Sequence, residues 1–113
     1  MRETLEVKSK VWLEVDGEAV LGLGRKMLLE AIHRHGSISR AAREVGISFR
    51  KAWGYIHSME EFLNTKLVET RVGGKGGGGA SLTAEARDLL AHYDKLLKGV
   101  NEAIDERFHE IFG

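Results

Sequence analysis

The sequence predicts a mainly α-helical protein with a small β component, arranged as one domain that ends in a long helix. Apolar residues recur at helical spacing through the centre and the C-terminal part of the chain, and they alternate with polar residues over 5–15 and 66–72. The length of 113 residues is that of a single domain. Apolar residues make up 42% and charged residues 30%, which is typical of a globular chain and excludes a disordered one.

The N-terminal third predicts two short strands and a helix. Apolar residues occupy odd positions between 5 and 15, and this period of two is typical of a half-buried strand. Asp16-Gly17 predicts a turn, and 19–21 a short returning strand. Apolar residues then recur at helical spacing, which predicts a first helix at about 24–35 with Gly36 as its C-terminal stop.

Two further helices meet at a turn that contains Gly46. Ser37 is the predicted cap of the second helix and Ser48 of the third. Helices that cross tightly in a helix-turn-helix need a small residue four positions before the turn glycine and apolar residues at fixed positions around it. The chain meets this pattern with Ala42, Val45, Ile47, Ala52 and Tyr55. We therefore predict a helix-turn-helix at about 37–63.

A glycine-rich hairpin is predicted to follow the helix-turn-helix. Residues 66–72 alternate as a strand and 80–82 return, while 73–79 hold six glycines and one lysine, which predicts a mobile hairpin tip. A helix-turn-helix followed by a hairpin is a winged helix, with its wing at about 66–82 in a domain of residues 1–83. A nucleotide phosphate loop is disfavoured because it needs Ser or Thr after its lysine, whereas Gly76 stands there. A linker without contacts is the other alternative.

The last predicted element is a helix over 84–113, capped by Thr83 and about 43 Å long at 1.5 Å per residue. Leu90, Leu97, Ile104 and Ile111 are seven residues apart, a heptad stripe that Gly99 and Arg107 interrupt locally. A domain of this size cannot cover such a helix, so we expect a dimerisation helix, with additional packing against the first helix near Leu89, Leu90 and Tyr93. The expected dimer contacts are Tyr93, Leu97, Val100, Ile104, Phe108 and Ile111.

The net charge is zero, but its distribution is uneven. Residues 34–58 hold five basic side chains against the single Glu44, a local charge of +4, whereas 84–113 hold four basic and seven acidic residues, a local charge of −3. The basic segment coincides with the helix-turn-helix, which indicates an anion-binding surface there.

In a helix-turn-helix, the N-terminal half of the second helix enters the major groove of DNA. Arg50 is then a donor to base edges, Lys51 and Ser48 meet phosphate, and Arg71 and Lys75 of the wing touch the backbone or the minor groove. For Trp53, packing and groove contact are equally open, and Phe49 is expected to be exposed. The candidate DNA-binding residues are Ser37, Ser39, Arg40, Ser48, Phe49, Arg50, Lys51, Trp53, His57, Arg71 and Lys75.

Other kinds of site find little support in the sequence. Cysteine is absent, and the histidines are scattered, so we expect no metal site and no cofactor. No histidine and carboxylate stand at a useful catalytic spacing, which argues against an enzyme. No stretch approaches about 18 consecutive apolar residues, and the N-terminus lacks the core of a signal peptide, so a cytoplasmic protein without a membrane partner is expected.

The runs 36–42, 46–53 and 73–83 resemble the N-terminal DNA-binding domain of the ModE-type molybdate-responsive transcriptional regulators. The helix-turn-helix is more distantly similar to that of LysR-type regulators. The resemblance covers about residues 20–100 and implies a homodimer, held mainly by the long helix, that binds a palindromic operator. Full regulators of this type carry C-terminal β-barrel domains that bind the oxyanion. Nothing of that kind follows here before Gly113, so molybdate sensing is not carried over to any residue.

The leading hypothesis is therefore a homodimeric, sequence-specific regulator that binds double-stranded DNA. The alternative is a winged-helix protein-interaction module that docks a separate effector-sensing protein through its long helix.

Overall fold

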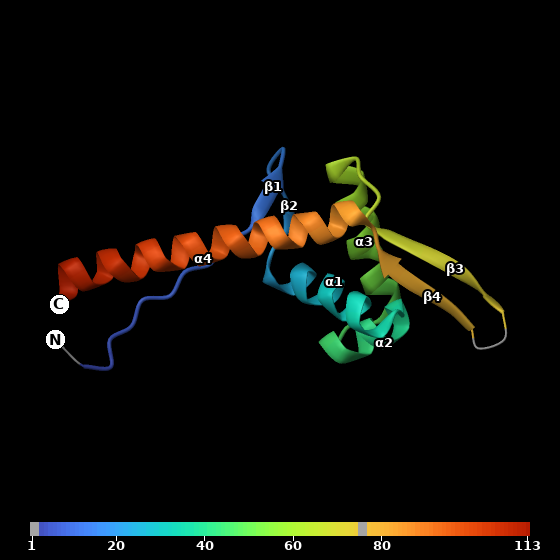
Figure 1. Cartoon of the computed structure of the whole chain (residues 1–113), viewed down its shortest axis with the longest axis horizontal. Helices are drawn as coiled ribbons and strands as arrows, with labels where there is room; N and C mark the ends of the chain where they lie inside the picture. Colours follow the sequence, from blue (N-terminus) through green and yellow to red (C-terminus); the bar gives the residue numbers. More distant parts are fainter. Residues whose placement is uncertain (1–2, 75–76) are drawn as a thin grey trace.

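The computed structural model describes residues 3–74 and 77–113. A short hairpin comes first, followed by helices that pack against one another, then a second hairpin and a helix that runs along most of the molecule (Figure 1). In chain order the elements are β1 (Leu13–Val15), β2 (Glu18–Leu21), α1 (Leu23–His35), α2 (Ile38–Val45), α3 (Phe49–Leu63), β3 (Val68–Gly74), β4 (Gly77–Leu82) and α4 (Ala84–Phe112).

Residues 3–12, here called the arm, differ from the sequence prediction. The alternation over 5–15 predicted one strand, but only its last part, β1, pairs with β2, across an Asp16-Gly17 turn with positive φ angles of 51° and 82°. The arm instead runs beside the C-terminal half of α4 (Figure 1). Because β2 is only four residues long, it offers the arm no backbone groups to pair with.

The helix boundaries follow from local capping chemistry, as predicted. The side chains of Ser37, Ser48 and Thr83 each accept a hydrogen bond from the backbone N–H three residues later, at 3.0 to 3.2 Å. Each such cap stabilises its helix by about 1 kcal/mol. Gly36 and Gly46 end α1 and α2 with φ of 64° and 79°, a left-handed conformation that side chains with a Cβ rarely adopt.

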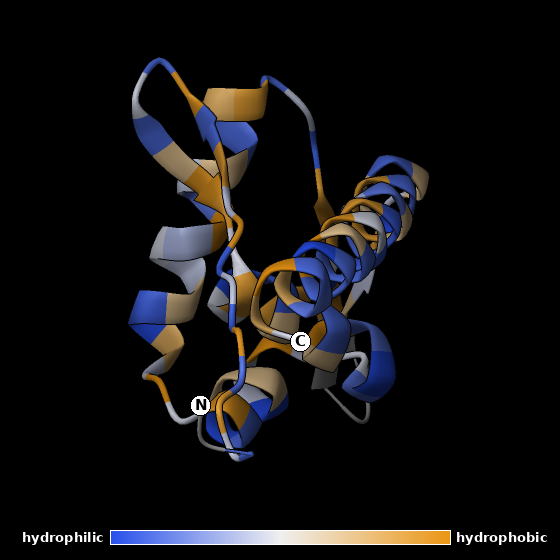
Figure 2. Ribbon diagram, turned by 90° about the vertical axis from the view of Figure 1, so that its left-hand side faces the viewer, coloured by the Kyte–Doolittle hydropathy of each residue, from blue (hydrophilic) through white to orange (hydrophobic). Residues whose placement is uncertain are grey.

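One buried core joins the helix-turn-helix, both hairpins and the start of α4. Ala42 and Ala52, the small residues predicted at the crossing of α2 and α3, are 2% and 0% exposed. Viewed from the C-terminal end of α4, the other helices and the first hairpin lie on one side of it (Figure 2). The largest fully buried side chains are Val20, Leu21, Leu28, Leu29, Ile32, Ile56, Met59, Leu67, Val68 and Tyr93.

The second hairpin is the predicted wing, but its strands are longer than expected. Glycines predicted to form only a mobile tip continue the strands, so that Arg71 pairs with Gly79 and Gly74 with Gly77, with an irregularity between these two pairs. Glycine can follow an extended ladder because the ladder uses only backbone groups. The Ala80 N–H donates to the Gly36 carbonyl oxygen at 2.9 Å, which fixes the wing against the end of α1.

The first part of α4 belongs to the core, and the rest extends away from it. Leu90 and Tyr93 are buried, whereas Ile111 is 61% exposed. The molecule measures 61 × 29 × 21 Å, and its radius of gyration of 17.4 Å exceeds the roughly 13 Å of a compact domain of this length. Among the residues that the structure describes, no helix combines the length and apolarity needed to cross a lipid bilayer.

Candidate nucleic-acid interface

Helix α3 has a buried face and an exposed face. Ala52, Ile56 and Met59 are 0% exposed and anchor the helix in the core. The exposed face lies on the other side of the helix, while Trp53, Tyr55 and Ser58 at its borders are half-buried. The exposed positions include the predicted contacts Phe49, Arg50, Lys51 and His57, together with Gly54. The first turn of this helix holds no acidic residue, so its positive N-terminal end is not offset by a nearby carboxylate of its own.

An aromatic row runs along α3 from its first residue. The rings of Phe49 and Trp53 meet edge to face with centroids 6.2 Å apart, and Trp53 stacks on the ring of His57 at 5.0 Å. Phe49 is 53% exposed, as expected, while Trp53 is half-buried. The structure thus places the indole between its two neighbours at the edge of the surface, where it packs and still lines a hollow.

That hollow, of about 210 Å³, lies between α3, the start of α2 and the wing. The start of α2 lines the hollow with two serines, the N-cap residue Ser37 and Ser39 in the first turn. The wing contributes the Arg71 side chain. Phe49 and Trp53 form an apolar wall. The remaining lining residues are Ile38, Thr70, Gly79 and Ala80.

Gly79 lets Arg71 lie across the wing. These residues are paired in the ladder between β3 and β4, and a Cβ atom on Gly79 would lie 2.7 Å from Nη2 of Arg71 and 3.4 Å from the Gly36 carbonyl oxygen. Real Cβ atoms essentially never approach a neighbour as closely as 2.7 Å. Sequence reasoning missed this role because it treated the glycine run as a whole, without the register that pairs Gly79 with an arginine.

The only carboxylate in segment 34–58 is already neutralised. Glu44 of α2 forms ion pairs with Arg34 and, at 3.2 Å, with Nε2 of His35. The hydrogen bond from His35, together with Arg34, lowers the pKa of the Glu44 carboxyl from its ordinary value. The basic side chains left for an outside anion are Arg40, Arg43, Arg50 and Lys51; within residues 3–74 and 77–113, none of these four forms an ion pair with a carboxylate.

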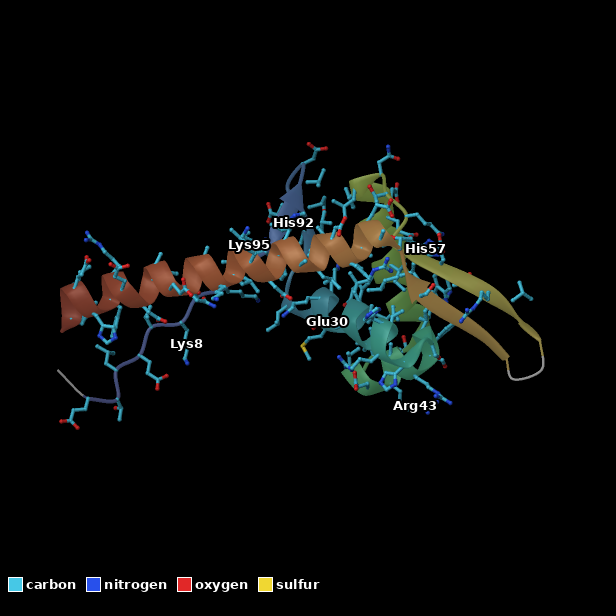
Figure 3. The ribbon with its side chains drawn as sticks, in the orientation of Figure 1. Lys8, Glu30, Arg43, His57, His92 and Lys95 are labelled. Carbon is cyan, nitrogen blue, oxygen red and sulfur yellow. The ribbon has the colours of Figure 1, made fainter. Side chains whose placement is uncertain are left out.

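The other predicted contacts lie around the same surface. Arg40 is exposed on α2, and Arg43 lies on the outer side of that helix (Figure 3). The Lys51 ammonium lies 5.8 Å from the centroid of the Tyr55 ring, so the lysine is drawn toward its own helix. Ser48 uses its oxygen to accept from the Lys51 N–H, which leaves its O–H as a donor. Lys75 lies outside the described residues.

The predicted dimer contacts divide into three groups. Tyr93 is 2% exposed within its own chain and donates its hydroxyl hydrogen to the Val11 carbonyl oxygen at 2.6 Å, so its ring belongs to the core, near which it was also expected to pack, and its part in a dimer seam stays a prediction. Ile111 is exposed, as are Leu96 and Phe112. The remaining contacts are half-buried, and Leu97 packs against the core; they are Leu97, Val100, Ile104 and Phe108.

A helix-turn-helix whose exposed helix adjoins a two-stranded wing defines a winged-helix domain. Residues 25–87 match the model of the bacterial regulatory helix-turn-helix proteins of the lysR family, and the chain belongs to that family.

Its relatives are longer proteins. The chain is 46% identical over 82 residues to the molybdenum-pterin-binding protein MopB of Rhodobacter capsulatus, covering 73% of this chain and 30% of that one. It is 38% identical over 108 residues to the molybdenum transport protein ModE of Azotobacter vinelandii, with coverage of 93% and 40%. With the DNA-binding transcriptional dual regulator ModE of Escherichia coli K12 it shares 43% identity over 81 residues, with coverage of 72% and 31%. The chain thus spans about a third of the length of these relatives.

Solved structures share the fold at low sequence identity. The crystal structure of a CbnR_DBD–DNA complex superimposes with a TM-score of 0.57 at 18% identity, covering 77% of this chain and 94% of that one. The structure of ArgP from Mycobacterium tuberculosis gives 0.53 at 20% identity, covering 75% and 30%. At this sequence identity, the two structural similarities support the fold alone.

Proposed function

We propose that this chain is a DNA-binding domain of a transcriptional regulator, which places α3 in the major groove of double-stranded DNA and its wing along the backbone. The observation that carries the proposal is the hollow between α3 and the wing. It brings the N-terminal turn of α2 and the Arg71 guanidinium together beside the exposed start of α3. A helix N-terminus and an arginine are both donors suited to a phosphate oxygen.

The side chains then have separate roles. Arg50, exposed in the first turn of α3, donates to base edges and carries sequence discrimination. Arg40, Ser39 and Arg71 meet phosphates on either side of the groove and set the position of the helix. Lys51 adds positive charge near the same backbone, and Phe49 offers an apolar edge.

The shape of the molecule supports a homodimer that binds a palindromic operator. α4 extends well past the core, and its apolar residues Leu96, Ile111 and Phe112 remain 43%, 61% and 46% exposed within the chain. A second copy that pairs along the face of α4 that carries Ile111 would bury that side chain. Two-fold symmetry in the protein would then be matched by two half-sites in the DNA.

We place this regulator in the cytoplasm and assign it no catalytic activity.

The test begins with DNA selected from a pool of random 30-bp duplexes. Arg50→Ala is compared with Lys95→Ala, which removes an exposed charge from α4 (Figure 3). We expect Arg50→Ala to weaken binding to the selected duplex by roughly 10- to 100-fold and to lose preference over unselected DNA, at about 1 to 3 kcal/mol for a bidentate base contact. Lys95→Ala should bind as the wild type does. Failure of the wild type to enrich any sequence would contradict the proposal.

A second candidate function is docking of a separate sensor protein. A groove of about 610 Å³ at the start of α1 is lined by Trp12, Leu23 and Met27, which are 48%, 57% and 48% exposed, and also by Lys10 and Arg25. Exposed apolar surface of this kind is typical of interaction sites. A chain that selects no DNA sequence but forms a stable complex with a purified sensor subunit, lost in Met27→Asp, would favour this function instead.

A further inference from the structure

The side chains of the arm alternate as in a strand, but no strand of the described residues lies beside it. Val7 and Val11 are half-buried, and the residues on either side of each are exposed, including Lys8 (Figure 3). The Ser9 hydroxyl donates to the side-chain oxygen of Asn101 at 2.9 Å, and the Val11 carbonyl accepts from the hydroxyl of Tyr93. One side of the arm thus rests on α4.

The backbone of the arm is largely unused. Within residues 3–74 and 77–113, no backbone-to-backbone hydrogen bond joins 5–10 to another segment. An extended segment with free N–H and C=O groups and alternating side chains is a template for pairing with another strand. The absence of a neighbouring strand also explains why the predicted strand over 5–15 is not formed within one chain.

We propose that the arm pairs with the arm of a second copy as an antiparallel two-stranded ribbon centred on Val7. The inference rests on the homodimer of the proposed function, because the arm lies along the half of α4 where the two copies would meet. Two-fold symmetry then brings the two arms together in antiparallel orientation.

In this register the charged side chains of one arm lie opposite charges of the other sign on the second arm. Glu6 and Lys8 form an ion pair at 3.1 Å on the exposed side of the arm. Centred on Val7, the ribbon places each Glu6 opposite Lys8 of the partner subunit, so that opposite charges alternate along and across the ribbon. Cross-strand pairs of opposite charge favour pairing, and like charges oppose it. A parallel ribbon in register would place each charge opposite its own kind.

Cysteine cross-linking tests the ribbon directly, because the chain has no cysteine of its own. In the proposed register the two Val7 Cα atoms lie about 4.5 to 5.5 Å apart, within the range that a disulfide spans. Lys10 of one copy lies opposite residue 4 of the other copy. The two Lys10 residues are therefore six residues apart along the ribbon, about 20 Å at 3.3 Å per residue. We therefore compare Val7→Cys with Lys10→Cys under the same mild oxidation.

Most of the Val7→Cys protein is expected to form a disulfide-linked dimer, while Lys10→Cys stays largely uncross-linked. Equal cross-linking of both variants would overturn the register, as would no cross-linking of Val7→Cys in a sample that light scattering shows to be dimeric. DNA binding by reduced Val7→Cys is measured in parallel. Intact DNA binding without the Val7 cross-link contradicts the ribbon alone, whereas loss of sequence-specific DNA binding by the wild type contradicts the proposed function.

Discussion

The Lys26 ammonium of α1 lies 3.0 Å from Oδ1 of Asp94 in α4, and this ion pair joins α1 to the long helix. The hydrogen bond to Asp94 raises the pKa of Lys26 above its ordinary value, against a smaller opposing effect of burial, and Glu30 adds to the rise. The pair lies where α4 leaves the core, so it helps to set the direction in which the helix extends.

Asp94→Asn tests this ion pair. We expect the free energy of unfolding to fall by about 0.5 to 1 kcal/mol at pH 7, the range of a partly exposed pair. Because the pKa of Lys26 is raised in the folded protein, the stabilisation is complete below the unfolded value of about 10.4 and is lost as the pH rises through the folded value. Urea unfolding at pH 7 and pH 11 measures the difference, with Asp88→Asn as control. An equal effect of Asp94→Asn at both pH values would contradict the ion pair.

The ionisation of Glu44 makes the stability of the fold depend on pH with the opposite sign. Its pKa is lowered in the folded protein, chiefly by the hydrogen bond from His35 and also by Arg34, so its contribution is present above the unfolded pKa and is lost as the pH falls through the folded one. We expect the thermal midpoint of the wild type to fall between pH 5 and pH 3 more steeply than that of Glu44→Gln. Glu61→Gln, at an exposed site on α3, should follow the wild type. Identical slopes for all three would refute the assignment.

Gly79→Ala tests the position of Arg71. The added Cβ would meet the Arg71 guanidinium at 2.7 Å and push it away from the hollow. We expect DNA affinity to fall by about as much as in Arg71→Ala, roughly 3- to 10-fold for one charged phosphate contact, and the double variant to be no worse than either. Gly99→Ala, where nothing lies within 4 Å of the new Cβ, should leave DNA binding intact and stabilise α4 by about 1 kcal/mol. Additive losses in the double variant would contradict the shared mechanism.

Ile111→Glu tests the dimer seam. Placing a carboxylate on the 61% exposed apolar residue near the end of α4 should raise the dimer dissociation constant at least tenfold. Light scattering of the variant should then approach the 12.6 kDa of one chain at concentrations where the wild type is twice that mass. Glu110→Gln provides a control one residue away. A wild type that is monomeric at every concentration would contradict the seam itself.

Sequence reasoning succeeded where the determinants of structure are local. Ser37, Ser48 and Thr83 were found as helix caps because a cap depends on residues within one turn, and Ala42 and Ala52 because a tight helix crossing requires small residues. The heptad stripe of α4 identified the long helix on the same basis.

It failed where a residue depends on a distant segment. Tyr93 was expected to pack near the core, but nothing in the heptad stripe indicates that its hydroxyl donates to the Val11 carbonyl oxygen, 82 residues away in the chain. The arm has the correct period for a strand and no strand beside it. The close approach of Gly79 to Arg71 depends on a ladder register that the run of glycines does not specify.

The most direct test of the account is the salt dependence of binding to the selected duplex. Contacts from Arg40, Lys51 and Arg71 in each of two protomers predict that log K falls with log salt concentration with a slope of about −5, since each phosphate contact contributes about −0.9. Arg71→Ala should reduce the steepness by about 2, one contact in each protomer. Binding that does not change between 50 and 300 mM salt, or a slope unaltered in Arg71→Ala, would contradict the claim that α3 and the wing form one DNA-binding surface.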